Sequence, residues 1–499
     1  TMADRLNAPR ANLGWMCQRV LRILNGKLPI TLVTVQNQDA LLVRPVFGKE
    51  FKNEGVTYLE RYRCVPVGKE VADINPATTM ELYGSLLRGA FEARPEVIAV
   101  DLDGLPLELL CFAVEGIVVA LMEPHDFKTD GRAYHGPKKI EILKSIVDSE
   151  SPQMVSELFA KGIERGRYRN LQRFLGHLDP AVLNPESYRN LVYRLVHGEY
   201  DVEVMEPNDY KSLGLLHAVA RGSQYDGYVL AFRVDPASGP TSEVAIRIGK
   251  GMTYDSGGVM DKGDHMPGMK LDMMGSAAVL SAGLYFLAHP QELGQSTVYV
   301  LCLAENRDGS TAYVPDEILV SCKGLTVENT HPDAEGRLVL ADGMAWICEL
   351  FAEGEELDIV SILTIATLTG AAWMALSTPY SALFQKGDKQ DELGKLRAMG
   401  DDCADPVWPL PMSHPHYGQQ MKSQVADLRN TGKEKPGGAC QAAAFLAQFL
   451  PDDYKGEFLH LDIAGSVDID MEGTPSTAKG LPQDAGVAFL IALDRKKMV

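Results

Sequence analysis

Short runs of apolar, β-branched residues alternate along the chain with longer segments in which apolar residues recur at helical spacing. In the first third of the chain, this pattern predicts three strands, at residues 31–36, 97–102 and 116–122. It predicts one helix in the same part, at residues 78–93. Such an alternation is typical of an α/β fold with a largely parallel sheet.

From about residue 183 onward, the apolar runs are longer and more continuous. They predict four strands, at residues 243–249, 296–305, 358–367 and 457–465. Helical patterns between these strands predict three helices, at residues 275–289, 337–351 and 440–450. Because continuous apolar strands are buried on both faces, we expect helices on each side of a mixed, largely parallel central sheet.

A charged helical pattern near residues 150–176, followed by a break that contains Pro and Asn, separates these two parts. With 499 residues, the chain is long enough for two domains that each bury a core. We therefore predict a smaller N-terminal α/β domain at residues 1–150, a connecting helix and linker at 151–182, and a larger catalytic α/β domain at 183–499. The first domain carries no chemical motif, and we expect it to serve as a scaffold or in assembly.

The charge balance narrows the classes of partner. The chain has 48 Lys and Arg residues against 67 Asp and Glu residues, and its net charge of -19 opposes a broad contact with nucleic acid or anionic lipid. The first fifteen residues lack the apolar run of a secretory signal, and we find no stretch of about 18 uncharged apolar residues that would span a membrane. None of the eight cysteines stands in C-x-x-C spacing, which favours a reduced compartment. We therefore expect a cytoplasmic protein with no membrane and no nucleic-acid partner.

Polar residues concentrate in three segments at the ends of the predicted strands, where open α/β sheets bind their ligands. These segments are residues 248–275, 328–343 and 366–372. In the first segment, Lys250 and Asp255 flank a glycine-rich turn that follows a strand, and Asp272 stands just before a helix.

In the second segment, Asp333 and Glu335 are two residues apart, so that both side chains point the same way in an extended backbone, and Arg337 follows two residues later. Together with Asp255 and Asp272 they make four carboxylates, which would repel one another unless cations lay between them. Two divalent metal ions about 3.5–4 Å apart would meet this need, and they could also polarise a carbonyl and activate a water.

The lysines and histidines near these carboxylates complete the candidate chemistry. Lys250 could be a metal ligand as the neutral amine, because an adjacent metal charge lowers the pKa of a lysine. Lys262 would then stay cationic and face the substrate oxygen. None of the eleven histidines is followed by Glu, so an H-E-x-x-H zinc helix is absent, but His265 and His331 lie close enough in sequence to be additional ligands.

Several of these signals also have a simpler interpretation. A lone Asp or Lys is most often a solvated charge, and Asp255 could form an Asx-turn with the glycines that follow it. Ser256 stands in a segment like the nucleophile segment of trypsin-like serine proteases, although the Gly before the Asp is missing here. Lys250 between two glycines could belong to a phosphate loop, although the pattern G-x-x-x-x-G-K-[ST] is not satisfied.

Four motifs occur in the order GKGMTYDSGG, MPGMKLDMMGSAA, PDAEGRLVLADG and ATLTGA. In this combination the chain resembles the leucine aminopeptidase (cytosol aminopeptidase) family of two-metal exopeptidases. The resemblance covers residues 183–499 and extends to WPLPM, ADLRNTG and HLDIAGS. It implies a smaller N-terminal α/β domain that a helix joins to a larger catalytic domain, and a homohexamer.

The resemblance also implies a role for each matching residue. The implied metal ligands are Lys250, Asp255, Asp272, Asp333 and Glu335, of which Asp255 and Glu335 would bridge the two metals. Lys262 would stabilise the oxyanion, and Arg337 would hold a bicarbonate ion that acts as the general base. The implied lining of the site for the first residue of the peptide is Met269, Thr367, Leu368 and Gly370.

The implied activity is hydrolysis of the N-terminal peptide bond of peptides with a free N-terminus, with a preference for apolar residues such as Leu or Met. The implied cofactors are two divalent metal ions that activate hydroxide, Zn and/or Mn, with Mg or Co as alternatives. One departure from the family stands at His331 and Pro332, where the family usually has Asn-Thr directly before Asp333. Two other functions stay open: a two-metal phosphoesterase, which would use similar carboxylates, and a catalytically impaired family member with a binding or assembly role, which the departure at His331 and Pro332 suggests.

Overall fold

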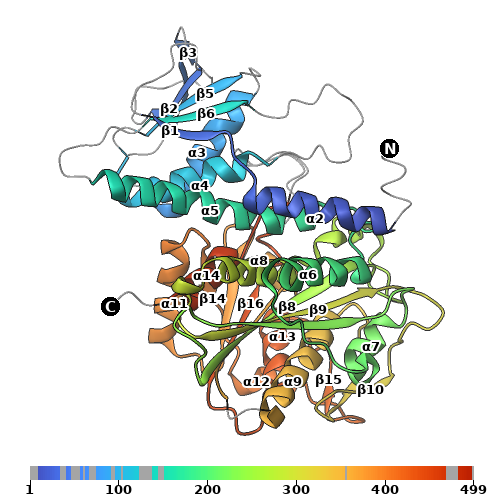
Figure 1. The fold of residues 1–499 in the computed structure, drawn as a ribbon. Helices are drawn as coiled ribbons and strands as arrows, with labels where there is room; N and C mark the ends of the chain where they lie inside the picture. The colour runs from blue at the N-terminus through green and yellow to red at the C-terminus, as the bar shows by residue number, and fades with distance from the viewer. Residues whose placement is uncertain are drawn as a thin grey trace.

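The chain folds around two β-sheets with layers of helices between and beside them (Figure 1). The computed structural model describes residues 9–33, 41–46, 57–59, 62–66, 75–91, 96–102, 105–122, 137–143, 151–354, 357–467 and 482–496.

The first sheet has six strands in the order β1-β6-β5-β2-β4-β3. The strands are β1 (Ile30–Val33), β2 (Leu41–Val46), β3 (Thr57–Leu59), β4 (Tyr62–Pro66), β5 (Val97–Asp101) and β6 (Lys139–Leu143). All neighbouring strands are parallel except β3 and β4. The helices in this part of the chain are α2 (Pro9–Asn25), α3 (Pro76–Phe91) and α4 (Leu110–Ala120).

Two of the three predicted strands in this part are found. Strand β5 confirms the prediction at residues 97–102, and β1 confirms the start of the strand predicted at 31–36, of which residues 34–36 lie outside the described residues. Helix α3 confirms the helix predicted at residues 78–93 as far as Phe91, and residues 92–93 again lie outside the described part.

The strand predicted at residues 116–122 is wrong, because this stretch forms the second half of helix α4 and the turn after it. Every residue of α4 is buried. A helix that is buried all round carries no amphipathic period, so a short apolar run within it has the same appearance as a buried strand. Gly116 also has a packing role, since a Cβ there would lie 2.0 Å from the backbone oxygen of Met80 in α3.

The second sheet has seven strands in the order β14-β13-β16-β12-β8-β9-β7. The strands are β7 (Tyr228–Val234), β8 (Glu243–Asp255), β9 (Ser296–Asn306), β12 (Asp358–Ala366), β13 (Ser381–Gln385), β14 (Val407–Pro409) and β16 (Glu457–Asp462). The four central strands are parallel to one another, whereas β7 runs antiparallel to β9, and β13 antiparallel to β16. The predicted mixed, largely parallel α/β sheet and its four predicted strands are therefore confirmed.

Helices cover both faces of this sheet, as the continuous apolar strands require (Figure 1). One face packs against α6 (Pro185–Tyr200), α8 (Met274–Ala288) and α14 (Val487–Asp494). The other face packs against α7 (Gly214–Ala220), α9 (Gly336–Gly354) and α13 (Gly438–Leu446). Helices α8, α9 and α13 confirm the three predicted helices, although α13 ends at Leu446 and a short 3₁₀ turn follows it.

Smaller elements border the second sheet. They are α10 (Gly370–Leu376), α11 (Gln390–Asp402), α12 (Pro415–Gln420) and a three-stranded sheet of β10 (Ile318–Val320), β11 (Thr326–Glu328) and β15 (Leu428–Arg429).

Helix α5 (Pro152–His177) confirms the helix predicted near residues 150–176 and lies between α4 and α8 (Figure 1). Three of its arginines, Arg165, Arg169 and Arg173, are buried. Arg169 forms ion pairs with Glu115 of α4 and, at 2.5 Å, with Asp484 near α14. The domain boundaries at residues 150 and 182 stay a prediction.

One stretch, Met269–Ala288, is long and apolar enough to cross a membrane, with a mean hydropathy of 1.4. It is not an uncharged run of the kind considered above, because it contains Lys270 and Asp272. In the structure, 89% of it is buried inside the protein, where α8 packs on the second sheet and on α5.

Candidate metal centre

The carboxyl end of strand β8 places the first two candidate ligands. Lys250 and Asp255 both lie within β8, so the predicted glycine-rich turn between them is wrong. Gly249, which directly precedes Lys250, allows helix α8 to pack close to the strand, because a Cβ at this position would lie 2.5 Å from the Cα of Ser276. The turn comes after Asp255, where Gly257 has a φ of 89°.

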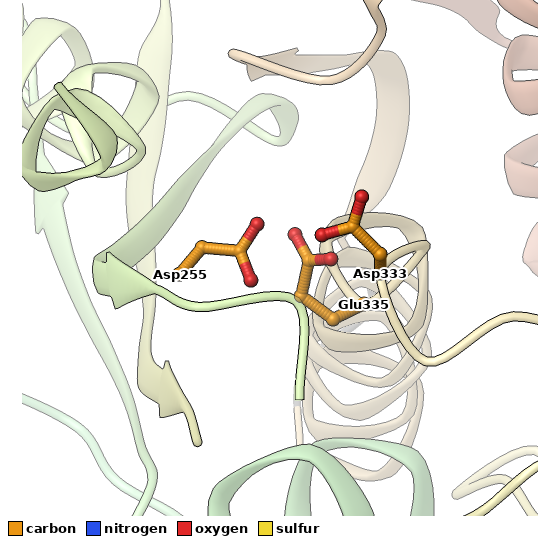
Figure 2. Close-up of side chains that lie close together, drawn as sticks. All are labelled: Asp255, Asp333 and Glu335. Carbon is orange, nitrogen blue, oxygen red and sulfur yellow. The ribbon is translucent and has the colours of Figure 1, made fainter. Parts of the chain in front are cut away.

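Three carboxylates meet at this end of the sheet. Asp255, Asp333 and Glu335 each offer an oxygen, and these atoms all lie within 4.8 Å of one another. Figure 2 shows Asp255 at the end of its strand, facing Asp333 and Glu335 beside the start of α9. No other group of three His, Cys, Asp or Glu side chains among the described residues has this spacing.

The side chains of Asp333 and Glu335 lie close together, but not through the extended backbone that the sequence predicted. Asp333 lies in a turn closed by the Ala334 N–H, which donates to the His331 carbonyl at 2.9 Å, and Glu335 directly precedes helix α9. The backbone is therefore not extended through this segment. The helix start also favours negative charge, because its N–H groups carry partial positive charge.

Two lysines contact the carboxylates. The buried Lys250 Nζ lies 2.7 Å from Asp272 Oδ1 and 2.9 Å from Glu335 Oε1, and it donates to the Thr367 carbonyl at 2.9 Å. Lys262 Nζ lies 2.7 Å from Asp255 Oδ2 and also pairs with Asp333. Burial alone would lower the pKa of both lysines, but the surrounding carboxylates raise it above its usual range.

The pKa values of the carboxylates show how crowded the negative charge is. Burial raises the pKa of Asp255 to about 6, with the Glu335 charge adding to the effect, and burial also raises those of Asp272 and Asp333. Glu335 differs, because Lys250 and Lys262 outweigh its burial and lower its pKa to about 2.

The donor set fits divalent cations. Asp272 Oδ2 and Glu335 Oε2 are buried without a hydrogen-bond partner, and a buried carboxylate oxygen without a donor or a cation is costly. Oxygen ligands together with one amine suit Mg, Mn, Co or Zn. In the structure, the ammonium groups of Lys250 and Lys262 neutralise part of the negative charge of these carboxylates.

All eleven residues predicted for the site line one cavity of about 770 Å³. Lys250, Asp255 and Asp272 come from the β8–α8 region, Asp333 and Glu335 from the loop before α9, and Thr367 and the residues after it from the loop after β12. Arg337, the second residue of α9, donates to the Asn430 carbonyl at 2.7 Å, and burial lowers its pKa to about 10.

The structure agrees with the Asx-turn at Asp255 but not with the serine nucleophile or the phosphate loop. Asp255 does form the Asx-turn, since its Oδ1 accepts from the Gly257 N–H at 2.9 Å, and it belongs to the carboxylate cluster as well. Ser256 Oγ donates to the Asn306 carbonyl at 2.9 Å, so the hydroxyl is directed at the backbone and not at a base. Lys250 lies in a strand and not in a phosphate loop. His265 and His331 line the cavity but are not members of the cluster.

Sequence reasoning missed four buried polar residues around the cluster. They are Asn306, Tyr313, Asn430 and Asp462. Asp462 accepts from the Leu368 N–H at 3.0 Å and from Thr369 Oγ1 at 2.7 Å, and it thereby joins the loops after β12 and β16. Asn430 and Asp462 lie in the quoted motifs ADLRNTG and HLDIAGS, which could have identified them, whereas Asn306 and Tyr313 lie outside every quoted motif.

Comparisons with known proteins agree with this arrangement. The catalytic-domain profile of the cytosol aminopeptidase family matches residues 170–491. A probable cytosol aminopeptidase of Mycoplasma pneumoniae is 34% identical over 82% of this chain and 89% of its own length. A cytosol aminopeptidase of Encephalitozoon cuniculi is 33% identical over 70% of each chain.

Two solved structures are similar over almost the whole chain. They are the bottromycin maturation enzyme BotP and the same enzyme in complex with Mn, with TM-scores of 0.73 and 0.74. Both are 26% identical to this chain and cover 91% of it and 98% of their own length.

Proposed function

Since the chain belongs to the cytosol aminopeptidase family and is therefore a metal-dependent aminopeptidase, we propose that the eleven residues around its carboxylate cluster form the catalytic site. The observation that carries this proposal is the convergence of Asp255, Asp333 and Glu335 with two lysines in one cavity. The substrates would be peptides with a free N-terminus.

The metal ligands would be Lys250, Asp255, Asp272, Asp333 and Glu335, with Asp255 and Glu335 shared between two ions. The fit rests on the unpartnered oxygens of Asp272 and Glu335 and on the crowded negative charge. Two such ions, Zn and/or Mn or else Mg or Co, would polarise the peptide carbonyl and supply hydroxide at neutral pH. Lys250 would then coordinate as the neutral amine.

Lys262 and Arg337 would handle the charges that develop on the substrate. The Lys262 ammonium lies at the cavity wall and, once its carboxylate partners are occupied by cations, could donate to the oxyanion. Arg337 is buried and anchored to the Asn430 carbonyl, so its guanidinium has a defined direction from which to hold a bicarbonate ion as general base.

The cavity wall beside the metal ligands would receive the first side chain of the peptide. Met269, Thr367, Leu368 and Gly370 line it, and Trp373 from α10 adds an aromatic ring. An apolar wall favours apolar side chains, so we expect Leu or Met at the first position.

Assembly and localisation are further parts of the proposal. We propose a homohexamer, as the sequence resemblance implies, and a cytoplasmic location, which the names of the relatives support. The N-terminal α/β domain, with the proposed bounds 1–150, would act as a scaffold or in assembly. Residues 151–182 would form the connecting helix and linker, and residues 183–499 the catalytic domain.

One assay tests this function against its alternatives. The metal-loaded protein is incubated with Leu-p-nitroanilide and with nitrophenyl phosphate, each with and without a chelator. We expect chelator-sensitive release of nitroaniline and no phosphate ester cleavage. An acylated substrate, N-acetyl-Leu-p-nitroanilide, should react far more slowly, because it has no free amine to bind. Phosphatase activity alone would favour the phosphoesterase, and no activity with Mn or Zn would favour an impaired family member.

A further inference from the structure

The loop that carries Asp333 is held at Pro332 by its carbonyl alone, because proline has no N–H to donate. This oxygen accepts from the Tyr313 hydroxyl at 2.5 Å and from Asn306 Nδ2 at 3.1 Å. Both donor residues are fully buried. The residue next to a candidate metal ligand is therefore fixed by two buried side chains from another part of the chain.

The same amide of Asn306 also holds Asp255. Asn306 Nδ2 donates to Asp255 Oδ1 at 2.9 Å, and the Gly257 N–H donates to that oxygen at the same distance. Two donors thus occupy Oδ1 and leave Oδ2 as the oxygen that faces Lys262, at 2.7 Å. Asn306 is itself anchored at the end of β9, where its carbonyl accepts from the Ser256 N–H and Oγ.

Asn306 therefore joins the Asp255 carboxylate to the backbone beside Asp333, and the fold brings these two segments from separate elements. Asp255 ends strand β8, and Asp333 lies in the loop before α9. Like charges at this spacing repel each other, so the two elements need bonds that oppose their separation, and Lys262 supplies part of this by pairing with both carboxylates. An amide with two N–H groups, one for each side, supplies such a bond without adding charge.

We propose that Asn306 and Tyr313 are positioning residues that set the spacing and direction of Asp255 and Asp333 for metal binding. This inference rests on the proposed function for the identity of the two ligands. It also explains how the chain accommodates His331 and Pro332, since the carbonyl of Pro332 takes up both donors. Such outer partners of metal ligands typically change metal affinity by about 10–100-fold when they are removed.

Metal affinity of the full-length protein tests the proposal without any substrate. Mn²⁺, and separately Zn²⁺, is titrated in competition with a chromophoric chelator. We expect Asn306→Ala to weaken binding by about tenfold or more. Tyr313→Phe removes one hydroxyl and keeps the packing, so we expect about threefold weaker binding, the effect of one net hydrogen bond.

Two buried polar residues of α5 provide matched controls. Asn170 Nδ2 donates to the Val118 carbonyl, and Tyr168 Oη donates to the Leu284 carbonyl, both outside the cavity lining. Asn170→Ala and Tyr168→Phe should lower the melting temperature and leave metal affinity unchanged.

Wild-type metal affinity in both Asn306→Ala and Tyr313→Phe would overturn the proposal, and so would an equal loss of affinity in the two controls. If Asn306→Ala does not fold, Tyr313→Phe against Tyr168→Phe decides the question. Failure of the proposed function is a separate result: a wild-type protein that binds two metal ions but cleaves no amino-acyl nitroanilide.

Discussion

Glu335 is the carboxylate whose charge acts on all three of the other carboxylates in the candidate centre. It is buried, it lies 2.9 Å from Lys250, and its charge contributes to the pKa shifts of Asp255, Asp272 and Asp333. The two lysines keep Glu335 ionised, because they lower its pKa to about 2. It is therefore the residue whose charge the proposed metal site needs most.

Glu335→Gln should weaken metal binding by more than about 100-fold, because it removes a shared ligand and not merely an outer partner. Chelator competition measures the affinity, and peptidase activity at a fixed metal concentration should fall with it. Glu457→Gln is the matched control, since Glu457 begins β16 and pairs with Gln385 outside the cavity lining. Unchanged metal affinity in Glu335→Gln would contradict the site assignment.

Trp373 permits a second test at the level of one side chain. Its side chain lines the cavity and is still 49% exposed, whereas the neighbouring Met374 is 76% exposed and is not part of the lining. Trp373→Ala should raise KM for Leu-p-nitroanilide about fivefold, which corresponds to ~1 kcal/mol of aromatic contact, and leave kcat nearly unchanged. Met374→Ala should change neither constant. A fall in kcat without a rise in KM would refute substrate contact by Trp373.

The eleven residues of the proposed site could be selected from the sequence because they lie in short motifs near strand ends, and the structure places all eleven in the lining of one cavity. Asn306 and Tyr313 could not be predicted in the same way. Their importance lies in contacts with Pro332, which is 26 and 19 residues away, and these contacts depend on which strands are neighbours. A single sequence does not state that β9 lies beside β8.

At the scale of elements, the packing of α8 on β8 depends on glycines. Gly249→Ala would place a Cβ 2.5 Å from the Ser276 Cα, and backbone cannot move aside as a flexible side chain can. We expect a loss of ~1–3 kcal/mol in the free energy of unfolding, measured by chemical denaturation. In Gly394→Ala, a glycine of helix α11 with no atom within 4 Å of the new Cβ, stability should be unchanged or slightly higher. Equal stability in both variants would contradict the close-packing role.

The incorrect prediction of a strand at residues 116–122 has the same physical origin as the correct strand predictions in the second sheet. In each case the run is apolar on every side, and only length and neighbours distinguish a buried helix from a buried strand. Helix α4 lies between α3 and α5, so its whole surface is covered and its polar period disappears. Strand β9 is also buried at every position, but it lies between β8 and β7.

At the scale of the whole molecule, helix α5 joins the two sheets through buried contacts. Asn170 and Arg173 donate to the last carbonyls of α4, while Gln172 Nε2 donates to the Met274 carbonyl at the start of α8 and to the Ala485 carbonyl before α14. Lys270, two residues before Asp272, donates to the His177 carbonyl at the end of α5. The helix predicted to connect two domains is therefore packed between two cores, and its arginines are paired or bonded to carbonyls.

Acid stability of the whole fold can be traced to His460, which lies fully buried in the central sheet. Its Nδ1 lies 2.9 Å from Thr364 Oγ1, and its ring stacks on Phe384. Burial lowers the pKa of His460 from 6.5 to about 3, so the folded protein keeps the ring neutral while the unfolded chain protonates below pH 6.5. The unfolded state then binds more protons, and stability falls as the pH drops from 6.5 toward 3, by up to ~1.4 kcal/mol per pH unit.

His460→Gln should therefore lower the melting temperature at pH 7.5 but make it fall less steeply than that of the wild type between pH 6.5 and 5. The exposed His416, replaced in the same way, should leave both the melting temperature and its slope unchanged. Parallel melting curves for wild type and His460→Gln across this range would show that the ring is protonated in the folded protein.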